Sequence, residues 1–179
     1  MKDFMKEVLS TSIYILVVLC VCFLMVRYVG QRTEVDGESM TPTLQDHDNL
    51  IVDKISYRFR DPERFDIIVF PYKYEEDTYY IKRVIGLPGE SVRIDWDGNI
   101  FINGQILSEN YGKEVMKNPG RAETEIILGE NEYFVLGDNR NDSKDSRNEQ
   151  VANIKKEEII GRAWLRLTPF KTFGLLKDN

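Results

Sequence analysis

The sequence predicts a mainly β domain of antiparallel sheets preceded by one N-terminal transmembrane helix. An apolar stretch lies close to the N-terminus, and short strand-like runs alternate with turn signals through the rest of the chain. The 179 residues are 42% hydrophobic and 30% charged, a balance that fits a folded domain rather than a disordered chain. The length suffices for one anchor and one domain.

The apolar stretch at residues 8–29 is expected to be the membrane helix. Residues 13–26 form an unbroken apolar run when their tyrosine and two cysteines are counted as apolar, and the uncharged residues 10–12 extend it. Crossing the hydrocarbon core takes roughly 20 such residues. We therefore expect residues 1–7 to be a short tail and residues 30–179 to form the folded domain.

A cleaved signal peptide is the alternative interpretation of this stretch. Its apolar region would be shorter, and a small-x-small cleavage site would follow it. Here the run ends in Met25-Val26-Arg27-Tyr28, which contains no such site. The sequence therefore favours an uncleaved anchor.

The charges that flank the apolar stretch do not orient it, because two lysines precede it and two arginines, Arg27 and Arg32, lie at its far side. Its two cysteines, Cys20 and Cys22, are two positions apart and point to different faces of a helix. We expect no disulfide between them, and we interpret both as small apolar residues that face lipid.

Charge and motif content exclude several function classes. Residues 1–29 hold three Lys/Arg and two Asp/Glu, which leaves 24 − 3 = 21 against 30 − 2 = 28 and a net charge of −7 for residues 30–179. This acidic balance argues against nucleic acid as a partner. The single histidine, His47, has no second histidine to complete a metal site, and no phosphate loop or dinucleotide fingerprint is present. We expect neither a metal nor a cofactor.

Eight β-strands are expected from runs rich in β-branched and aromatic residues. Asp97-Gly98 and Asn103-Gly104 are strong hairpin turns, and Leu87-Pro88-Gly89 ends a strand in a third turn. Residues 110–123 are polar and irregular, typical of a surface loop, and residues 153–159 suit one short helical turn. The expected strands are Leu50–Ile55, Asp66–Phe70, Tyr79–Ile85, Ser91–Asp95, Ile100–Ile102, Glu125–Leu128, Tyr133–Leu136 and Ile159–Leu167.

Ser39 is the first candidate for chemistry. Pro42 pushes the residue before it towards an extended conformation, and Gly37 allows close backbone approach. Both features suit a strand that leads into an exposed turn with Ser39 at its mouth. Taken alone, an ordinary surface-loop serine is the simpler interpretation, because serine is common in turns.

Lys82 makes a catalytic role for Ser39 plausible, because a neutral lysine can activate a serine without histidine or aspartate. Strand alternation puts Tyr80, Lys82 and Val84 on one face. Burial there would lower the lysine pKa; at the ordinary value near 10.4, only about one lysine in 2,500 is neutral at pH 7. An edge-strand lysine that extends to water is the alternative, and periodicity does not separate the two.

A third segment, residues 137–147, holds three acids and three bases and follows the expected core strand 133–136. A solvated loop is the usual interpretation of such a charge run. A loop that starts from a rigid strand is also a frequent position for functional residues.

Together these segments resemble the type I signal peptidases, membrane-anchored serine proteases that remove signal peptides from exported proteins. The resemblance covers most of the chain, and Asp66–Phe70 looks like the family's intervening strand motif. The other motifs that carry it are Gly37-Glu38-Ser39-Met40-x-Pro42-Thr43-Leu44, Tyr80-Ile81-Lys82-Arg83-x-Ile85-Gly86-Leu87-Pro88-Gly89 and Gly137-Asp138-Asn139-Arg140-x-x-Ser143-x-Asp145-Ser146-Arg147.

The resemblance implies a signal-peptidase-like β fold with a Ser39 nucleophile and a Lys82 general base. Ser143 matches the position that orients the lysine, and Asp145 and Arg147 match an ion pair that shapes the site. Asp138 matches a supporting acid, and Arg83 matches the basic residue after the lysine. The residues implied to line pockets for small side chains at substrate positions −1 and −3, Ala-x-Ala in typical signal peptides, are Val35, Met40, Leu44, Tyr80 and Ile81.

The sequence departs from the family pattern at Gly37, where many members have a serine that helps the oxyanion hole. The Ser39 backbone N–H is one donor, and the second stays open between Gly37, another N–H and water. Phe65 stands where a glycine is frequent, which affects packing rather than chemistry.

The short length resembles the compact, single-anchor form of Gram-positive bacteria. In that family the N-terminus is cytoplasmic and the catalytic domain lies outside the cytoplasm, anchored in the cell membrane. The implied partners are signal peptides and membrane lipid, with no cofactor and no nucleic acid; the oligomeric state stays open.

Two other functions remain as alternatives. Self-cleaving repressors of the SOS response share the dyad and fold, but the anchor and the acidic charge count against them. A catalytically silent, membrane-anchored binding domain is the other, and the intact set of Ser39, Lys82, Ser143 and Asp145 counts against it.

Overall fold

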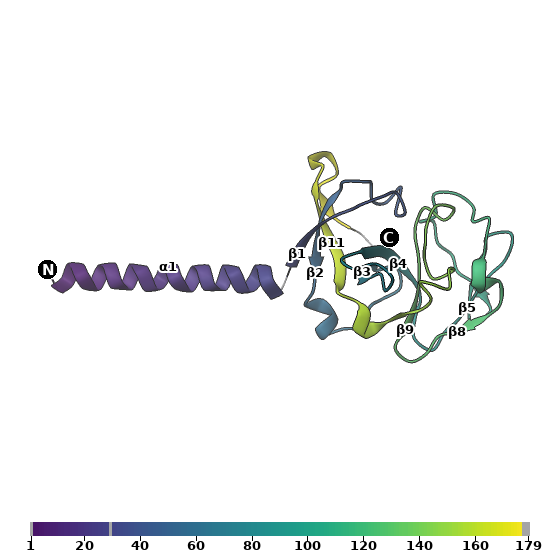
Figure 1. The fold of residues 1–179 in the computed structure, drawn as a ribbon, viewed down its shortest axis with the longest axis horizontal. Helices are drawn as coiled ribbons and strands as arrows, with labels where there is room; N and C mark the ends of the chain where they lie inside the picture. The colour runs from purple at the N-terminus through teal and green to yellow at the C-terminus, as the bar shows by residue number, and fades with distance from the viewer. Residues whose placement is uncertain (1, 29, 177–179) are drawn as a thin grey trace.

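The computed structural model describes residues 2–28 and 30–176, and it places one long helix, α1 (Lys2–Tyr28), ahead of a β domain (Figure 1). The helix begins earlier than the expected residue 8, and position 29 lies outside the described residues. Its segment Phe4–Phe23 is long and apolar enough to cross a membrane and is not buried against the protein. The Ser12 hydroxyl donates to the Val8 carbonyl at 2.8 Å, so this polar group is satisfied within the helix.

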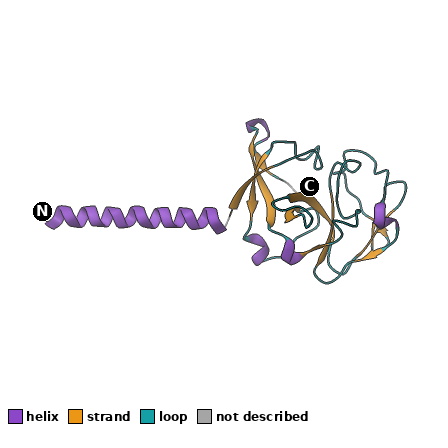
Figure 2. Ribbon diagram, in the orientation of Figure 1, coloured by secondary structure: helices purple, strands orange, loops and turns teal. Residues whose placement is uncertain are grey.

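Cys20 and Cys22 are exposed and unbridged on α1, as predicted. Figure 2 shows that regular helix is confined to α1 and a few short turns. These turns are 3₁₀ segments at Ser56–Arg58, Gly120–Glu123, Lys156–Glu158 and Phe170–Thr172.

Two antiparallel sheets make up the domain. The large sheet has the order β1-β2-β11-β3-β4-β9-β10, with β12 beside β11, and the small sheet has the order β7-β6-β5-β8. Figure 1 places β1 and β2 next to the end of α1 and β5 and β8 at the far end of the domain. The strands are β1 (Gly30–Glu34), β2 (Asn49–Asp53), β3 (Ile67–Pro71), β4 (Tyr79–Gly86), β5 (Ser91–Ile94), β6 (Ile100–Ile102), β7 (Gln105–Ile106), β8 (Ile126–Ile127), β9 (Glu132–Leu136), β10 (Ile154–Lys155), β11 (Gly161–Thr168) and β12 (Gly174–Leu175).

All eight expected strands are present, with ends displaced by at most two residues. The three expected turns form as well: Gly98 and Gly89 have φ values of 85° and 78°, and Asn103 and Gly104 both have positive φ. The 153–159 segment contains the expected helical turn at 156–158. The sequence did not indicate β1, β7, β10 or β12, because these strands are polar or only two residues long.

The large sheet is covered on both faces, so its central strands are buried on both sides. On β3, Ile67 and Val69 enter one apolar cluster, whereas Ile68 and Phe70 enter another. A third cluster lies between the sheets, where Ile85 of β4 packs with residues of β5 and β6. Burial on both faces stabilises β4, in which residues 81–86 are all buried.

Candidate active site

Lys82 lies on β4, which is paired on one side with β3 and on the other with β9. It stands opposite Ile68 and is only 3% exposed. The edge-strand interpretation of this lysine is therefore wrong. The predicted alternation holds over this part of β4, because Val84 packs in the same cluster as Ile68 whereas Ile81 packs in the cluster on the other face.

Ser39 is half-buried in the turn that follows β1, and contacts from the loop after β9 hold that turn. The Asn139 N–H donates to the Ser39 carbonyl at 3.0 Å, and the Asn139 side chain donates to the Glu38 carbonyl at 3.1 Å. Lys82 Nζ lies 2.7 Å from Ser39 Oγ and also donates to the Ile81 carbonyl at 3.0 Å. The structure thus joins the two predicted catalytic residues, and Asn139 is a supporting residue to which the motif match gave no role.

The environment of Lys82 favours its neutral form. Burial lowers the pKa of Lys82 to about 8, and the negative charges of Asp145 and Asp138 oppose this effect. At pH 7 about a tenth of the molecules then carry a neutral lysine, compared with about one in 2,500 at an ordinary pKa. A buried lysine within hydrogen-bond distance of a serine hydroxyl has the geometry of a general base, and its lowered pKa makes the neutral form accessible near neutral pH.

Gly137, at the start of the loop after β9, allows a close approach between two predicted site residues. A Cβ at this position would stand 2.1 Å from Ser143 Oγ and 2.5 Å from the Ser39 carbonyl oxygen. Ser143 Oγ is itself buried and has no hydrogen-bond partner among residues 2–28 and 30–176. The structure brings Ser143 close to the Ser39 turn but does not bond it to Lys82, so its lysine-orienting role stays a prediction.

Replacing Gly137 by alanine should therefore reduce activity by at least about tenfold, because the added methyl must displace the Ser39 turn or Ser143. The matched control is Gly129→Ala, since a Cβ at Gly129 makes only ordinary contacts of 3.4 Å and longer, all to a side chain. Steady-state cleavage rates and thermal melts of both variants test this. Full activity of Gly137→Ala would contradict the proposed tight packing.

Arg83 and Asp138 form an ion pair that is fully buried. The guanidinium donates to both carboxylate oxygens at 2.9 and 2.6 Å, and the Thr43 hydroxyl donates to the same carboxylate. Arg83 also lies over the Tyr111 ring, 3.7 Å from its centroid. The pair fastens the loop after β9 to β4; removing one partner would leave an uncompensated buried charge.

Phe65, which stands where the family often has glycine, has a φ of 75°. Its ring lies 5.0 Å from that of Tyr111, so the side chain extends the packing around Arg83. A glycine would adopt this φ with little strain but would lose that contact.

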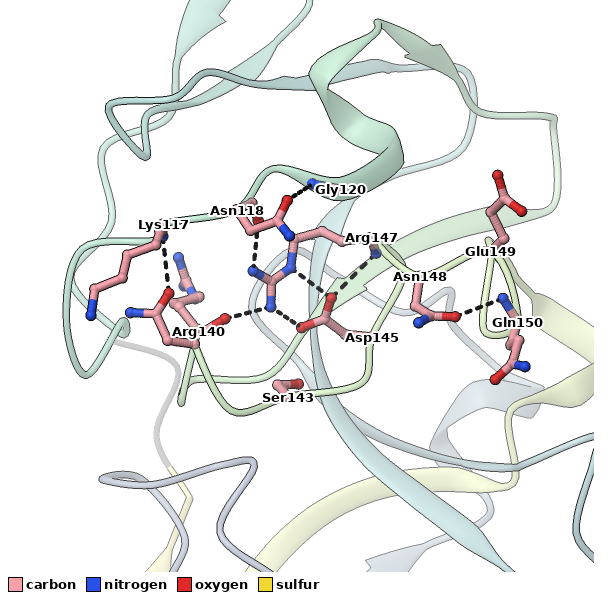
Figure 3. Close-up of a pocket in the computed structure, with 11 residues that line it drawn as sticks. Lys117, Asn118, Gly120, Arg140, Ser143, Asp145, Arg147, Asn148, Glu149 and Gln150 are labelled. Atoms are coloured by element: carbon pink, nitrogen blue, oxygen red, sulfur yellow. Dashed lines mark hydrogen bonds and ion pairs between the residues drawn. The ribbon is translucent and has the colours of Figure 1, made fainter.

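Asp145 and Arg147 form the ion pair that the resemblance implied. Two guanidinium nitrogens donate to the two carboxylate oxygens, both at 2.8 Å, and the Gly137 N–H donates to the same carboxylate at 3.1 Å. Figure 3 shows this pair at a polar hollow of about 780 Å³, with Ser143 below it. The hollow adjoins the candidate site through Ser143 and Asp145.

A separate cleft of about 480 Å³ contains Ser39 and Lys82. Residues 33–40 form one side and residues 77–82 the other, joined by Asp142 and Lys144. Of the predicted substrate-binding residues, Val35, Met40, Tyr80 and Ile81 line this cleft. Leu44 does not: it is fully buried beneath the cleft in the same apolar cluster as Val35, Met40 and Ile81.

Gly37 adopts a φ of 90°, a conformation that favours glycine, and its N–H donates to Asp46 at 2.8 Å. A Cβ there would meet open space, so the expected close backbone approach is wrong; the backbone conformation explains the glycine. Since its N–H is engaged, Gly37 is not a ready oxyanion donor. The Ser39 N–H makes no hydrogen bond within the described part of the chain and is available for that role.

His47 pairs with Glu34 at 2.8 Å and lies 3.3 Å from an Asp46 oxygen, on the surface. Within residues 2–28 and 30–176, no group of three or more His, Cys, Asp or Glu side chains is arranged to hold a metal ion.

The family profile and the similar sequences agree on one family. The profile described as signal peptidase, peptidase S26, matches residues 6–168. A probable signal peptidase I-2 of Synechocystis sp. is 41% identical over 158 residues, covering 85% of this chain and 69% of the relative. Signal peptidase I P of Bacillus subtilis subsp. natto is 36% identical over 154 residues, or 82% of each chain. A solved signal peptidase I of Enterococcus faecalis is 35% identical, with a TM-score of 0.48 over 57% of this chain and 97% of that one. The chain belongs to the signal peptidase family, peptidase S26.

Proposed function

We propose that this chain is a membrane-anchored serine endopeptidase that cleaves N-terminal signal peptides from exported preproteins after small-x-small sites. The observation that carries the proposal is the 2.7 Å contact between Ser39 Oγ and the buried Nζ of Lys82, in a cleft on a chain of the signal peptidase family. A serine hydroxyl beside a lysine of lowered pKa has the two groups that acyl transfer needs.

In the proposed reaction, neutral Lys82 takes the proton of Ser39 as the hydroxyl oxygen attacks the scissile carbonyl carbon. The negative charge on the tetrahedral intermediate is stabilised by the Ser39 N–H and a second donor. The protonated lysine then gives its proton to the leaving amine, which releases the mature protein. A water activated by the same lysine hydrolyses the acyl-enzyme and restores Ser39.

The cleft suits an extended substrate that lies between residues 33–38 and residues 77–81. Successive side chains of an extended peptide alternate in direction, so those at −1 and −3 point the same way. We place them against the apolar floor made by Val35, Met40 and Ile81, which are 3%, 1% and 8% exposed. Because these side chains are close-packed in the core, they do not yield easily to a larger substrate residue, which supports small residues at −1 and −3.

The anchor supplies proximity to substrate. We propose that residues 1–7 lie in the cytoplasm, residues 8–29 cross the cell membrane and residues 30–179 lie outside. The structure supports a short connection, since α1 extends to Tyr28 and β1 begins at Gly30. Ten residues from position 29 to Ser39 span at most about 35 Å, which keeps the site near the bilayer that holds the signal peptide.

Full-length protein in liposomes should cut a preprotein after Ala-x-Ala, with the product identified by mass spectrometry. Leu or Phe at −1 should reduce cleavage by at least about a hundredfold, because neither fits the filled floor. Removing residues 1–29 should reduce cleavage of liposome-embedded preprotein far more than it reduces acylation of Ser39 by a small serine-directed inhibitor.

Two outcomes would contradict the proposal. The first is efficient cutting after Leu or Phe at −1. The second is equal activity of the truncated and anchored forms on embedded preprotein. A preprotein whose −1 and −3 alanines are both replaced by leucine is the matched substrate control.

A further inference from the structure

Lys144 lines the candidate cleft, although its neighbours in sequence face elsewhere. Within residues 141–145, the even-numbered residues Asp142 and Lys144 line the cleft. The odd-numbered residues line the polar hollow, where Figure 3 shows Ser143 and Asp145. This segment is therefore a wall between two hollows, and it presents a lysine to the substrate side of the site.

Aromatic rings fix the position of the Lys144 ammonium. Its Nζ donates to the Tyr72 hydroxyl and lies 4.5 Å from the centroid of the same ring. The Tyr72 ring stacks on Tyr80, with centroids 4.6 Å apart and an angle of 9° between the planes. The Tyr80 ring in turn lies 5.0 Å from Lys82 Nζ. Lys144 is thus held on the Tyr80 and Lys82 side of β4, opposite Ile81.

Lys144 keeps its positive charge, and no nearby carboxylate of the described residues forms an ion pair with it. The hydrogen bond that the Lys144 ammonium donates to the Tyr72 hydroxyl raises the pKa of Lys144, so the ammonium persists across the working range. No carboxylate within the described ranges comes within 4.0 Å of its nitrogen, unlike Lys73, which pairs with Glu158 at 2.9 Å. Exposed acidic residues also line the cleft and oppose part of the attraction that Lys144 exerts on a substrate carboxylate, so the effect of Lys144 is expected to be modest. These residues are Glu34, Asp36, Glu38, Asp77 and Asp142.

The alternation of an extended substrate determines which position meets Lys144. With −1 and −3 against Val35, Met40 and Ile81, the −2 side chain points to the other side of the cleft. Lys144 stands on that side with Tyr80, which alternation along β4 puts opposite Ile81 and which is joined to Lys144 through the Tyr72 ring. Tyr80 is therefore assigned here to position −2, and not to the −1 and −3 pockets that the resemblance implied. This step rests on the proposed function, because it requires the peptide to lie in the cleft as described above.

We propose that Lys144 determines specificity at substrate position −2. It favours a side chain with a carboxylate or carbonyl oxygen there and disfavours lysine and arginine. A partly exposed charge pair changes affinity modestly, so the expected preference for Glu over Lys at −2 is about fivefold in kcat/KM. Specificity of this kind combines attraction of one side chain with repulsion of another.

The test uses the full chain in detergent and three peptides that share Ala at −3 and −1 but carry Glu, Gln or Lys at −2. The wild type should cleave in the order Glu, Gln, Lys. Lys144→Glu should reverse the order, and Lys144→Gln should make the three rates similar. Lys113→Glu is the matched control, because Lys113 is exposed, lines neither hollow and gives the same change in net charge; it should keep the wild-type order.

The outcomes separate this inference from the proposed function. If the wild type cleaves none of the peptides and no preprotein, the proposed function fails. If the wild type cleaves the peptides but Lys144→Glu keeps the wild-type order of rates, the inference is overturned. It is also overturned if Lys113→Glu reverses that order as Lys144→Glu does. A parallel series that varies +1 gives a further check, since a reversal there instead of at −2 would also overturn it. Adding 1 M salt should reduce the wild-type preference.

Discussion

Replacing Ser39 by alanine should abolish preprotein cleavage, with a fall of at least about a thousandfold in kcat, because the oxygen that forms the acyl-enzyme is removed. The fold should persist, since the Ser39 main chain keeps its contact with the Asn139 N–H. Cleavage of a preprotein in liposomes measures the loss, and thermal melting measures the stability.

Ser108→Ala is the matched control, because Ser108 is exposed and lies outside the cleft. It should retain wild-type activity. Residual activity of Ser39→Ala above about a hundredth of wild type would remove Ser39 from the role of nucleophile.

Lys82→Arg and Lys82→Met should both be as inactive as Ser39→Ala. Arginine keeps the charge but does not deprotonate near neutral pH, and methionine fills a similar buried volume with no base. The methionine variant is the informative one, because an arginine beside Ser39 Oγ also crowds a site where the lysine is 3% exposed. Substantial activity in either variant would make Lys82 structural or electrostatic instead of a base.

The wild-type pH profile gives an independent check on the same residue. The base acts in its deprotonated form, so kcat/KM should rise with pH through the Lys82 pKa of about 8 and level off above it. Well below that pKa the slope should be about tenfold per pH unit, since the neutral fraction grows at that rate. A flat profile between about pH 6 and 9 would contradict the assignment of Lys82 as the base.

The sequence by itself determined the strands and turns that build the site. Local patterns suffice to predict strands and turns. The alternation over Tyr79–Ile85 is a property of that one segment. Asn103-Gly104 is a turn sequence by itself, and both residues have positive φ in the structure. The motifs also identified Ser39 and Lys82 as the reacting pair from the sequence alone. The polar β1 and the two-residue strands β7, β10 and β12 escaped prediction because they are too polar or too short to carry a recognisable alternation pattern.

Only the tertiary structure decided what surrounds those residues. Alternation assigns Lys82 to one face of its strand but does not show whether that strand is central in the sheet. The strand is central because β3 and β9 pair with its two sides. These partners are distant in sequence; Arg83, for example, pairs with Leu136. The same holds for the Arg83–Asp138 pair, which joins residues 55 positions apart, and for Leu44, which packs below the cleft instead of lining it. Burial and ion pairing are set by long-range contacts, and these contacts, more than any local motif, give Lys82 the pKa that the proposed chemistry requires.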